Sequence, residues 1–522
     1  MNNDDLVNVA LSRRQFGKGL FAATSLIAGS TFGLIGKAYA SQPKTGGHLR
    51  VASYASSAND TMDPAKAVFA NDYFRCFTFY NALTRPDVKV QAQPDLAESW
   101  EAFDGAKRWV FKIRKDVKFH NGKAFTAHDV VYSMNRHKVP ETGSAAKAIA
   151  DTFASVTATT DHEVEFVLTD GNADLPLVLA TAHFVIVADG ATEFSDGGNG
   201  TGPYKLKEFR PGVKTLGERN ASYHRPGAYV DSIEVFGIND GIARTNALVS
   251  GQADIILKVE KNTLAVIEGS GTAEVFRTPS AGFPCVSMQM DQSPFDNNDL
   301  RLAMKYLIDR ERLLKTSFHG YGVIANDHIF HPDSAYYNAD IPQRTMDLDK
   351  AKFHLNKAGM VGQTIDMHVS EASVGGIDIG LTMQQAAAKA GLTLNLRREP
   401  ADGFWSNIWA KRAFYAAEWN PRPVYDMILS LAFMPGAAWN ETHIKDEKLA
   451  GLIAEARGET DQKRRKELYG AVQLISNESA GYGIPLFFDF VDATTTKVKG
   501  IDAIPLGYLG GLYFAESVWL DQ

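Results

Sequence analysis

Residues 94–134 of this chain read PDLAESWEAFDGAKRWVFKIRKDVKFHNGKAFTAHDVVYSM, and this stretch decides the fold. Over residues 109–114, aromatic and β-branched residues alternate with basic ones, a pattern that predicts a β-strand. Asn121-Gly122 then predicts a tight turn. Thr126, followed three residues later by Asp129, predicts the start of a helix with a capping-box-like arrangement. The stretch therefore predicts a strand, a turn and a helix of an α/β protein.

Helix and strand patterns continue to alternate in the rest of the chain. One strong amphipathic helix is expected at residues 300–318, and a helix at 347–358 is followed by a strand at 365–370. A further helix at 377–390 precedes a strand at 392–397. Such alternation favours a mostly parallel sheet with crossover helices. Because 522 residues are too many for one core, two or more domains are expected.

The composition is that of an ordinary soluble globular protein, with 45% hydrophobic and 22% charged residues. Fifty-four basic and 61 acidic residues give a net charge of −7, which argues against nucleic acid as a partner. The two cysteines, Cys76 and Cys285, form no zinc-like spacing. They either pair in an oxidising compartment or remain as two buried thiols, and the sequence leaves both possibilities open.

The first 40 residues have the features of an export signal. Arg13 and Arg14 lie in the run SRRQFGK, which looks like a twin-arginine motif, and a moderately apolar run occupies residues 19–36. Small residues dilute that run, so it would span a membrane poorly. Ala38-Tyr39-Ala40 is a small-x-small cleavage site, and cleavage is expected between Ala40 and Ser41. No lipobox cysteine is present, so the mature protein is expected to be free in the periplasm.

The order LAESWE, W.F.IRKDVKFHNGK and FTA.DVVYS within residues 94–134 closely resembles the signature of a known family. This family is the peptide and nickel class of extracellular solute-binding proteins, family 5, which serve ABC importers. The runs YNALTR, GTGPYKL, ALVSGQADI and IDRE continue the match along the chain. The resemblance implies a carrier and not an enzyme, with no cofactor, and a membrane permease as its partner.

The resemblance also implies an architecture, a two-lobed periplasmic-binding-protein-like type II fold of the α/β class. Its sheets are mixed, and the first lobe holds an extra subdomain. The composition shifts near Ser280, and residues 483–490 become apolar and aromatic again, so we expect the chain to cross between lobes at these two points. The expected division is a signal peptide at 1–40, lobe I at 41–280 plus 487–522 with the subdomain at about 80–195, and lobe II at 281–486.

Four of the seven tryptophans gather in one short region of the second lobe, interleaved with polar residues. Aromatic walls and paired polar groups are what a ligand buried between lobes requires. The candidate ligand-binding residues of this region are Asp402, Trp405, Trp419, Asn420, Arg422, Asp426, Trp439 and Asn440. Trp409 is the fourth tryptophan of the group. About half of the tryptophans are expected to be structural, and Asp426 could instead cap the following helix.

Arg422 is the residue that departs from the family pattern. Peptide-binding members typically place an acidic residue in this loop for the α-ammonium of the peptide, whereas this chain reads EWNPRPVYD. A guanidinium in a dry cleft suits a carboxylate or phosphate. The expected solute is therefore a short peptide or another anionic or zwitterionic amino-acid derivative. Tyr54, Phe69 and Asn71 of the first lobe and Asp489 of the return crossover complete the candidate set.

Other functions remain open at the level of sequence. No GxSxG, HExxH or CxxC motif supports an enzyme. Oligosaccharide, opine and metal-chelate carriers (nickel or haem) are the alternatives, because aromatic platforms also suit sugars and some relatives bind metal complexes. Delivery to a chemoreceptor in place of a permease is a further possibility. A monomer is expected, and no bound metal ion.

Overall fold

The computed structural model describes residues 42–54, 56–194, 199–437 and 439–521. The twin-arginine signal and the cleavage site between Ala40 and Ser41 lie outside these residues.

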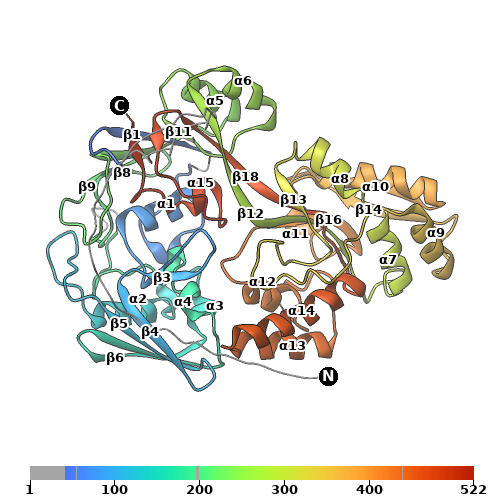
Figure 1. Ribbon diagram of the computed structural model, residues 1–522, viewed down its shortest axis with the longest axis horizontal. Coiled ribbons are helices and arrows are strands. Elements are labelled where there is room, and N and C mark those ends of the chain that lie inside the picture. Colours follow the sequence, from blue (N-terminus) through green and yellow to red (C-terminus); the bar gives the residue numbers. More distant parts are fainter. Residues whose placement is uncertain (1–41, 55, 195–198, 438, 522) are drawn as a thin grey trace, which may run out of the picture. The chain divides into compact units, whose positions relative to one another are not determined.

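The stretch at residues 94–134 forms the elements that its pattern predicts (Figure 1). The expected strand is β5 (Arg108–Ile113), which belongs to a four-stranded antiparallel sheet of order β4-β5-β7-β6. The expected helix is α2 (Ala127–Arg136), and the Asp129 carboxylate accepts a hydrogen bond from the Thr126 backbone N–H at 2.8 Å. Both halves of the capping box are present, so this prediction is confirmed. The other strands of the sheet are β4 (Ala97–Phe103), β6 (Phe153–Thr160) and β7 (Glu163–Leu168).

A twelve-stranded mixed sheet runs through the rest of the described chain in the order β15-β14-β16-β12-β18-β11-β1-β10-β9-β8. β13 pairs with β18 and β17 pairs with β12 beside this path. We call β11, β1, β10, β9 and β8 the β1 side, and β14, β15 and β16, together with the helices and loops that lie between β12 and β18 in the chain, the β14 side. The strands are β1 (His48–Ser53), β8 (Tyr204–Arg210), β9 (Lys214–Arg219), β10 (Ser232–Gly237), β11 (Ile255–Ile256), β12 (Ala273–Met288), β13 (Gly322–Ile324), β14 (Thr364–Val369), β15 (Thr393–Arg398), β16 (Phe414–Trp419), β17 (Tyr482–Gly483) and β18 (Leu486–Thr495).

Two long strands, β12 and β18, connect the β1 side to the β14 side. The first part of β12 pairs with β18 from Ala273 to Thr278, and its last part pairs with β16. Between Thr278 and Gly282 the register shifts. Ser280 lies at this shift, and its hydroxyl donates to the Phe488 carbonyl of β18 at 2.6 Å. The two sides are therefore joined by β12 and β18, and β12 changes its pairing partner near Ser280.

Helices cover both parts of the sheet, and most are short. The single helix expected at residues 300–318 is wrong as one element: α7 ends at Tyr306, and a new helical turn begins after Asp309. The Asp309 carboxylate accepts from the Arg312 N–H and so caps this new start. The helices are α1 (Ala70–Phe79), α3 (Lys147–Ala150), α4 (Leu175–Val178), α5 (Gly241–Val249), α6 (Leu264–Gly269), α7 (Asn298–Tyr306), α8 (Arg310–Arg312), α9 (Leu348–Lys357), α10 (Gly376–Ala390), α11 (Phe404–Asn407), α12 (Tyr425–Ala432), α13 (Glu447–Gly458), α14 (Gln462–Glu478) and α15 (Tyr508–Gly511). Two small sheets pair β2 (Thr84–Pro86) with β3 (Ala92–Pro94), and β19 (Val498–Lys499) with β20 (Trp519–Leu520).

The four-stranded sheet has its own apolar core, to which the β14 side contributes. Val424, at the start of α12, is buried in that core, and Met427 packs against it. Beside this contact, the Ala173 N–H donates to the Arg457 carbonyl at 2.8 Å. Arg465 of α14 forms an ion pair with Asp174. The start of α12 thus packs into this apolar core, while α13 and α14 bond to residues 173 and 174, just before α4.

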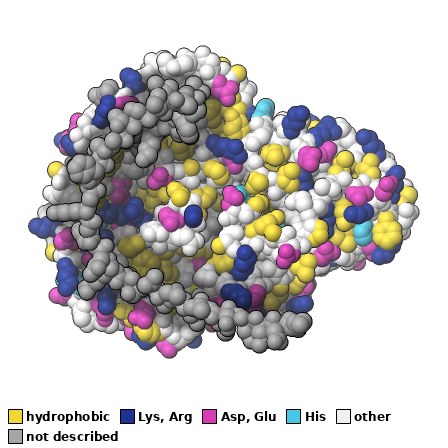
Figure 2. All heavy atoms as spheres, viewed as in Figure 1, with side chains coloured by type: hydrophobic (Ala, Val, Ile, Leu, Met, Phe, Trp, Pro, Cys, Tyr) yellow, Lys and Arg dark blue, Asp and Glu magenta, His cyan; other side chains and the backbone are white. Residues whose placement is uncertain are grey.

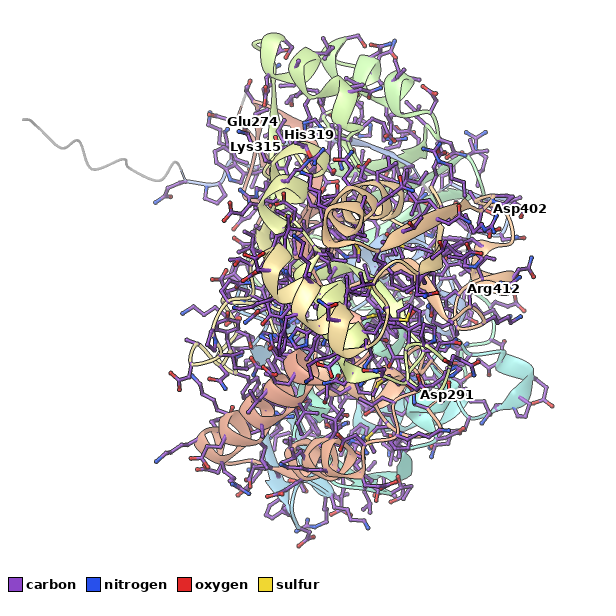
Figure 3. All side chains as sticks on the ribbon, turned by 90° about the vertical axis from the view of Figure 1, so that its right-hand side faces the viewer. Glu274, Asp291, Lys315, His319, Asp402 and Arg412 are labelled. Carbon is purple, nitrogen blue, oxygen red and sulfur yellow. The ribbon has the colours of Figure 1, made fainter. Side chains whose placement is uncertain are left out.

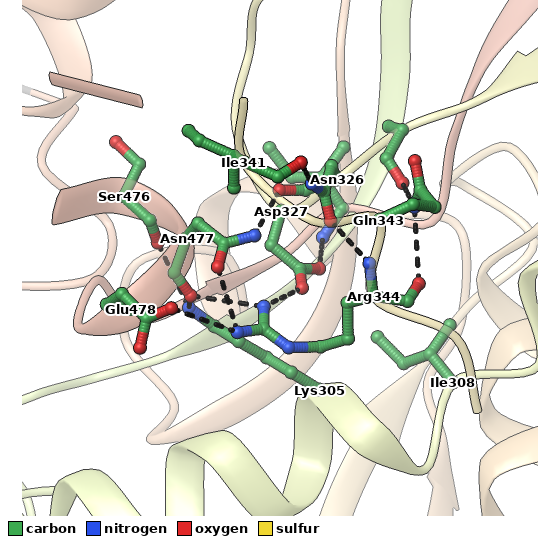
Figure 4. Close-up of polar contacts among 12 residues, drawn as sticks. Lys305, Ile308, Asn326, Asp327, Ile341, Gln343, Arg344, Ser476, Asn477 and Glu478 are labelled. Carbon is green, nitrogen blue, oxygen red and sulfur yellow. Dashed lines mark hydrogen bonds and ion pairs between the residues drawn. The ribbon is translucent and has the colours of Figure 1, made fainter. Parts of the chain in front are cut away.

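A buried ionic network holds the β14 side together (Figure 4). Asp327 is fully buried and accepts hydrogen bonds from Arg310 at 2.6 Å and from Arg344 at 2.5 Å. Burial alone would raise the pKa of the Asp327 carboxyl, but the two guanidinium groups outweigh burial and lower it. Lys305 lies in the same network and donates to the Ser476 and Asn477 carbonyls at the end of α14.

Charged side chains of both signs are interspersed on the part of the surface that Figure 2 shows in colour. This mixture agrees with the small net charge of −7. Cys76 and Cys285 are free, buried thiols in α1 and β12. None of the helices in the described part of the chain is both long and apolar enough to cross a membrane.

Candidate ligand-binding site

The candidate site is built at the carboxyl ends of parallel strands, where open α/β sheets generally bind their ligands. On the β1 side, β1 and β11 pair in parallel, and Tyr54 and Lys258 lie just beyond their carboxyl ends. On the β14 side, β14 runs parallel to both β15 and β16. The loop at residues 420–424 follows β16, so the candidate Arg422 lies at this second edge.

Arg422 has no carboxylate partner among the described residues. Its Nη1 donates only to carbonyls of its own loop, those of Asn420 at 3.3 Å and Pro421 at 3.2 Å. Burial lowers the pKa of the Arg422 guanidinium, and the hydroxyl of Tyr73, on α1, acts in the opposite direction. A desolvated cation without a counter-ion is costly to maintain. A guanidinium that is removed from water and bonded only to carbonyls is suited to binding an anionic group.

The four tryptophans that the sequence analysis singled out form one continuous row. Ring centroids are 6.2 Å apart for Trp405 and Trp409, 6.0 Å for Trp409 and Trp439, and 5.8 Å for Trp439 and Trp419. We call these residues the tryptophan row. Trp405 and Trp439 are 42% and 40% exposed, whereas Trp419 is only 4% exposed. The row therefore leads from solvent to a buried indole three residues before Arg422.

Glu441 fixes the buried end of the tryptophan row. Its carboxylate is fully buried and accepts hydrogen bonds from Trp419 Nε1 at 2.7 Å, Tyr415 Oη at 2.7 Å and Tyr482 Oη at 3.0 Å. Burial raises the pKa of this carboxyl, and the donors around it partly counteract the rise. One carboxylate thus orients an indole and two phenols, and no cation among the described residues pairs with it.

Replacing Glu441 with glutamine is expected to lower the free energy of unfolding by about 1–3 kcal/mol, because an amide N–H₂ would face a buried donor. Urea denaturation measures this change. The exposed Glu371 in the loop after β14 provides the matched control, since Glu371→Gln should leave stability within about 0.5 kcal/mol. Equal stabilities for the two variants would contradict the role given to Glu441.

Of four other predicted site residues on the β14 side, two bond to neighbouring residues of the protein and two are exposed. Asp426 is buried and paired with Arg457 at 3.0 Å, and it does not occupy the cap position of α12, which is Val424. The Asn440 side chain braces its own turn by bonds to Ile444 and Met434. Asn420 and Asp402 are exposed, and Figure 3 shows Asp402 at the same edge of the molecule as Arg412.

The predicted residues of the β1 side and the connecting strands are more dispersed. Tyr54 packs edge-to-face on Tyr508 at 5.2 Å, and burial raises its pKa to about 12. Phe69 is 41% exposed just before α1. Asn71 is buried, and its Oδ1 has no hydrogen-bond partner in the described part of the chain. Asp489 of β18 is paired with Arg277 of β12.

Sequence reasoning missed four residues near the site: Tyr73, Lys258, Tyr508 and Asp492. Tyr73 could have been found, because Phe69, Tyr73 and Phe77 recur every four residues and must share one face of α1. The other three come from segments far apart in the chain and have no local signal. Asp492, on β18, is fully buried and accepts the backbone N–H groups of Lys258 and Leu509.

Asp492 is expected to make stability depend on pH between about 4 and 7. Burial raises the pKa of this carboxyl from 3.8 to about 7, so the folded protein retains a proton that the unfolded chain releases. The stabilisation from this proton is complete below the pKa of the unfolded chain and is lost as the pH rises through the pKa of the folded protein, a change of about 4 kcal/mol.

Urea denaturation of the wild type and of Asp492→Asn from pH 4 to pH 8 measures this contribution. Asparagine does not titrate, so the difference between the two unfolding free energies isolates Asp492 from the other carboxyls. The stability of the wild type relative to the variant should decrease as the pH rises. A difference that is constant over this range would contradict the raised pKa.

Comparison with known proteins decides the family. The profile of the bacterial extracellular solute-binding proteins, family 5, matches residues 91–434. The chain belongs to this family. The glutathione-binding protein GsiB of Escherichia coli O1:K1 is 25% identical to this solute-binding protein over 467 residues, which cover 86% of this chain and 89% of GsiB.

Solved structures show the same fold. The DppA protein of Helicobacter pylori in complex with the peptide STSA aligns with a TM-score of 0.74 and 22% identity, over 92% of this chain and 99% of DppA. AgaA of A. tumefaciens R10 in complex with agropinic acid aligns with a TM-score of 0.74 and 20% identity, over 91% of this chain and 99% of AgaA. The expected two-lobed α/β fold with mixed sheets is therefore confirmed.

Proposed function

We propose that this protein is the periplasmic substrate-binding component of an ABC importer, which carries a short peptide or another amino-acid-derived solute to its permease. It acts by binding alone, without a catalytic step. The SRRQFGK run and the site after Ala40 support export by the twin-arginine pathway and cleavage before Ser41. We further propose that it works as a monomer.

Arg422 is the observation that supports this ligand class. It is a desolvated guanidinium at the carboxyl edge of the β14 side, with only loop carbonyls as partners. A carboxylate of the solute would supply the missing counter-ion through charge-assisted hydrogen bonds. The tryptophan row would supply apolar area beside it. The names of the relatives agree with this class, since they mention glutathione, a peptide and agropinic acid.

We propose that the lobes are residues 41–280 with 487–522, and residues 281–486, with the subdomain at about 80–195 in the first lobe. The change of partner in β12 near Ser280 supports the first boundary. The pairing of β18 with both β13 and β12 supports the second. β12 and β18 would then form the hinge about which the lobes close on the solute.

An opine is the second candidate, because it also carries carboxylates and AgaA is a structural neighbour with such a ligand. A neutral oligosaccharide would leave Arg422 without a counter-ion, which makes it a poorer candidate despite the tryptophan row. For a nickel or haem chelate, the described residues contain no cluster of three or more metal-ligating side chains. A chelate could still bind through its organic part.

Native mass spectrometry of the protein purified without refolding tests the proposal. Closure around a ligand slows its release, so an adduct that disappears on denaturation can be fragmented and identified. A peptide or opine mass supports the proposal, whereas a hexose mass or a metal isotope pattern overturns the ligand class. If no adduct is found, a thermal-shift panel of peptides, opines, sugars and metal chelates decides, because bound ligand raises the melting temperature by mass action.

A further inference from the structure

Lys258 is a second cation at the candidate site. It comes from the β1 side, whereas Arg422 comes from the β14 side. It is exposed just beyond the carboxyl end of β11, and its ammonium lies 5.1 Å from the ring centre of Tyr54. Its Nζ makes no ion pair or hydrogen bond among the described residues. Tyr54 itself lies just beyond the end of β1, the parallel neighbour of β11. Two strand ends thus bring a cation and a phenol to the same edge.

The backbone at Lys258 is held in an unusual conformation. Lys258 and Leu509 have φ values of 56° and 46°, in the left-handed region that side chains other than glycine rarely adopt. The buried Asp492 carboxylate accepts the backbone N–H of both residues. Tyr508, adjacent to Leu509, packs on Tyr54 at 5.2 Å. Such strain persists only where the surroundings enforce it, and it is concentrated at functional sites.

Glu418 brings the opposite charge from the other lobe. It lies near the carboxyl end of β16, where side-chain alternation points it away from the face that carries Tyr415 and Trp419. Its Oε2 accepts the Val374 N–H at 2.5 Å, and its Oε1 has no hydrogen-bond partner within the described residues. Burial raises the pKa of the Glu418 carboxyl, the Lys258 ammonium acts to lower it, and, beside burial, the charge of Glu418 in turn acts to raise the pKa of Tyr508. The two lobes therefore present an ammonium and a carboxylate to one region.

The chain itself limits the distance from Glu418 to Arg422. Glu418 and Arg422 are four residues apart, and a fully extended chain of that length spans at most about 14 Å. A single small solute can reach both. Such a solute meets the charges of Lys258 and Glu418 at one end and, at the other, that of Arg422, which has no carboxylate partner among the described residues.

We infer that Lys258 and Glu418 form a second subsite that binds the ammonium and carboxylate of an α-amino-acid headgroup, while Arg422 binds a second anionic group of the same solute. The preferred solute is thus an α-amino acid that carries a distal acid, such as a γ-glutamyl or β-aspartyl compound. Asp492 is the positioning residue of this subsite, since it holds Lys258 and the segment of Tyr508 around Tyr54. The inference rests on the proposed function and specifies its ligand.

Pairs of probes that differ by one group test each contact separately. The parent probe is γ-glutamylglycine, which has both carboxylates and the ammonium. γ-Aminobutyrylglycine lacks the α-carboxylate, N-acetyl-γ-glutamylglycine lacks the ammonium, and γ-glutamylglycinamide lacks the distal acid. β-Aspartylalanine, which also keeps its α-ammonium and α-carboxylate free, is a second member of the same class. Isothermal titration calorimetry gives the affinity of each probe for the wild type, Lys258→Met, Glu418→Gln and Arg422→Ala.

The wild type is expected to prefer the parent over each truncated probe by roughly tenfold or more. Each variant should lose only the preference that its residue provides. Lys258→Met should no longer distinguish the probe without the α-carboxylate, and Glu418→Gln should no longer distinguish the N-acetyl probe. Lys258→Arg should restore the first preference. The exposed Lys389 of α10 is the control, because Lys389→Met should behave as the wild type.

The outcomes separate the inference from the proposed function. If the wild type binds the probes and loses affinity in Arg422→Ala, but Lys258→Met and Glu418→Gln keep every preference, the second subsite is wrong and the function stands. If neither γ-glutamylglycine nor β-aspartylalanine binds while trialanine does, the acidic headgroup class is wrong and peptide transport stands. If no peptide or amino-acid derivative binds, both proposals are overturned.

Discussion

Replacing Asp327 with asparagine is expected to lower the free energy of unfolding by about 3–5 kcal/mol. Asp327 is fully buried between Arg310 and Arg344, and it also accepts the Ile484 N–H at 2.9 Å. An amide keeps the shape of the carboxylate but removes its charge. Two guanidinium groups would then be left buried without a counter-ion, and Lys305 lies in the same network. Chemical denaturation at pH 7 measures the loss.

Asp333 is a matched control for this experiment. It lies six residues further along the chain, its side chain is 89% exposed, and its contact with His331 is a long one of 3.8 Å. Surface pairs of this kind contribute little, so Asp333→Asn should change stability by less than about 1 kcal/mol. A loss for Asp327→Asn as small as that of the control would show that the network does not stabilise the fold.

Replacing Arg422 with alanine is expected to weaken binding of an anionic amino-acid-derived solute by about 2–5 kcal/mol, which is a factor of roughly 30 to a few thousand. The effect is large because the partner carboxylate of the solute would remain buried without a counter-charge. The melting temperature of the unliganded protein should hardly change, since Arg422 bonds only to carbonyls of its own loop. Calorimetric titration and a thermal scan measure the two properties on one sample.

Arg412 serves as the comparison for Arg422. It is an exposed arginine of the same lobe, before β16, at an edge that Figure 3 shows together with Asp402. Arg412→Ala changes the net charge by the same amount, so any general electrostatic attraction of an anion is matched. Equal losses of affinity in the two variants would remove Arg422 from the site. A loss confined to Arg422→Ala supports a direct contact.

The sequence predicts well those features that depend on neighbours in the chain. The strand, turn and capping box of residues 94–134 are local patterns, and each is present. The tryptophans come together because they lie within one short region of the sequence. The break after Tyr306 was missed because amphipathic spacing continues across it, while the Asp309 side chain starts a new turn.

Residues that act through distant partners could not be predicted in this way. Asp426 and Asn440 are turned inward because Arg457 and the Ile444 backbone supply nearer partners than a ligand would. Lys258 and Tyr508 are separated by 250 positions, and only the pairing of β11 with β1 and β18 brings their segments to Asp492. A buried carboxylate that organises two backbone segments has no sequence pattern of its own.

The tryptophan row gives the protein a built-in optical reporter. Four indoles within about 6 Å of their neighbours exchange excitation energy, so their fluorescence behaves as that of one coupled group. Its buried member, Trp419, lies three residues from Arg422, and its exposed members, Trp405 and Trp439, are in contact with water. A solute that displaces this water shifts the emission of the whole group to shorter wavelength. If the solute binds along the row as proposed, ligands can be screened on the unlabelled protein, and single Trp→Phe changes along the row would show how far along it a solute extends.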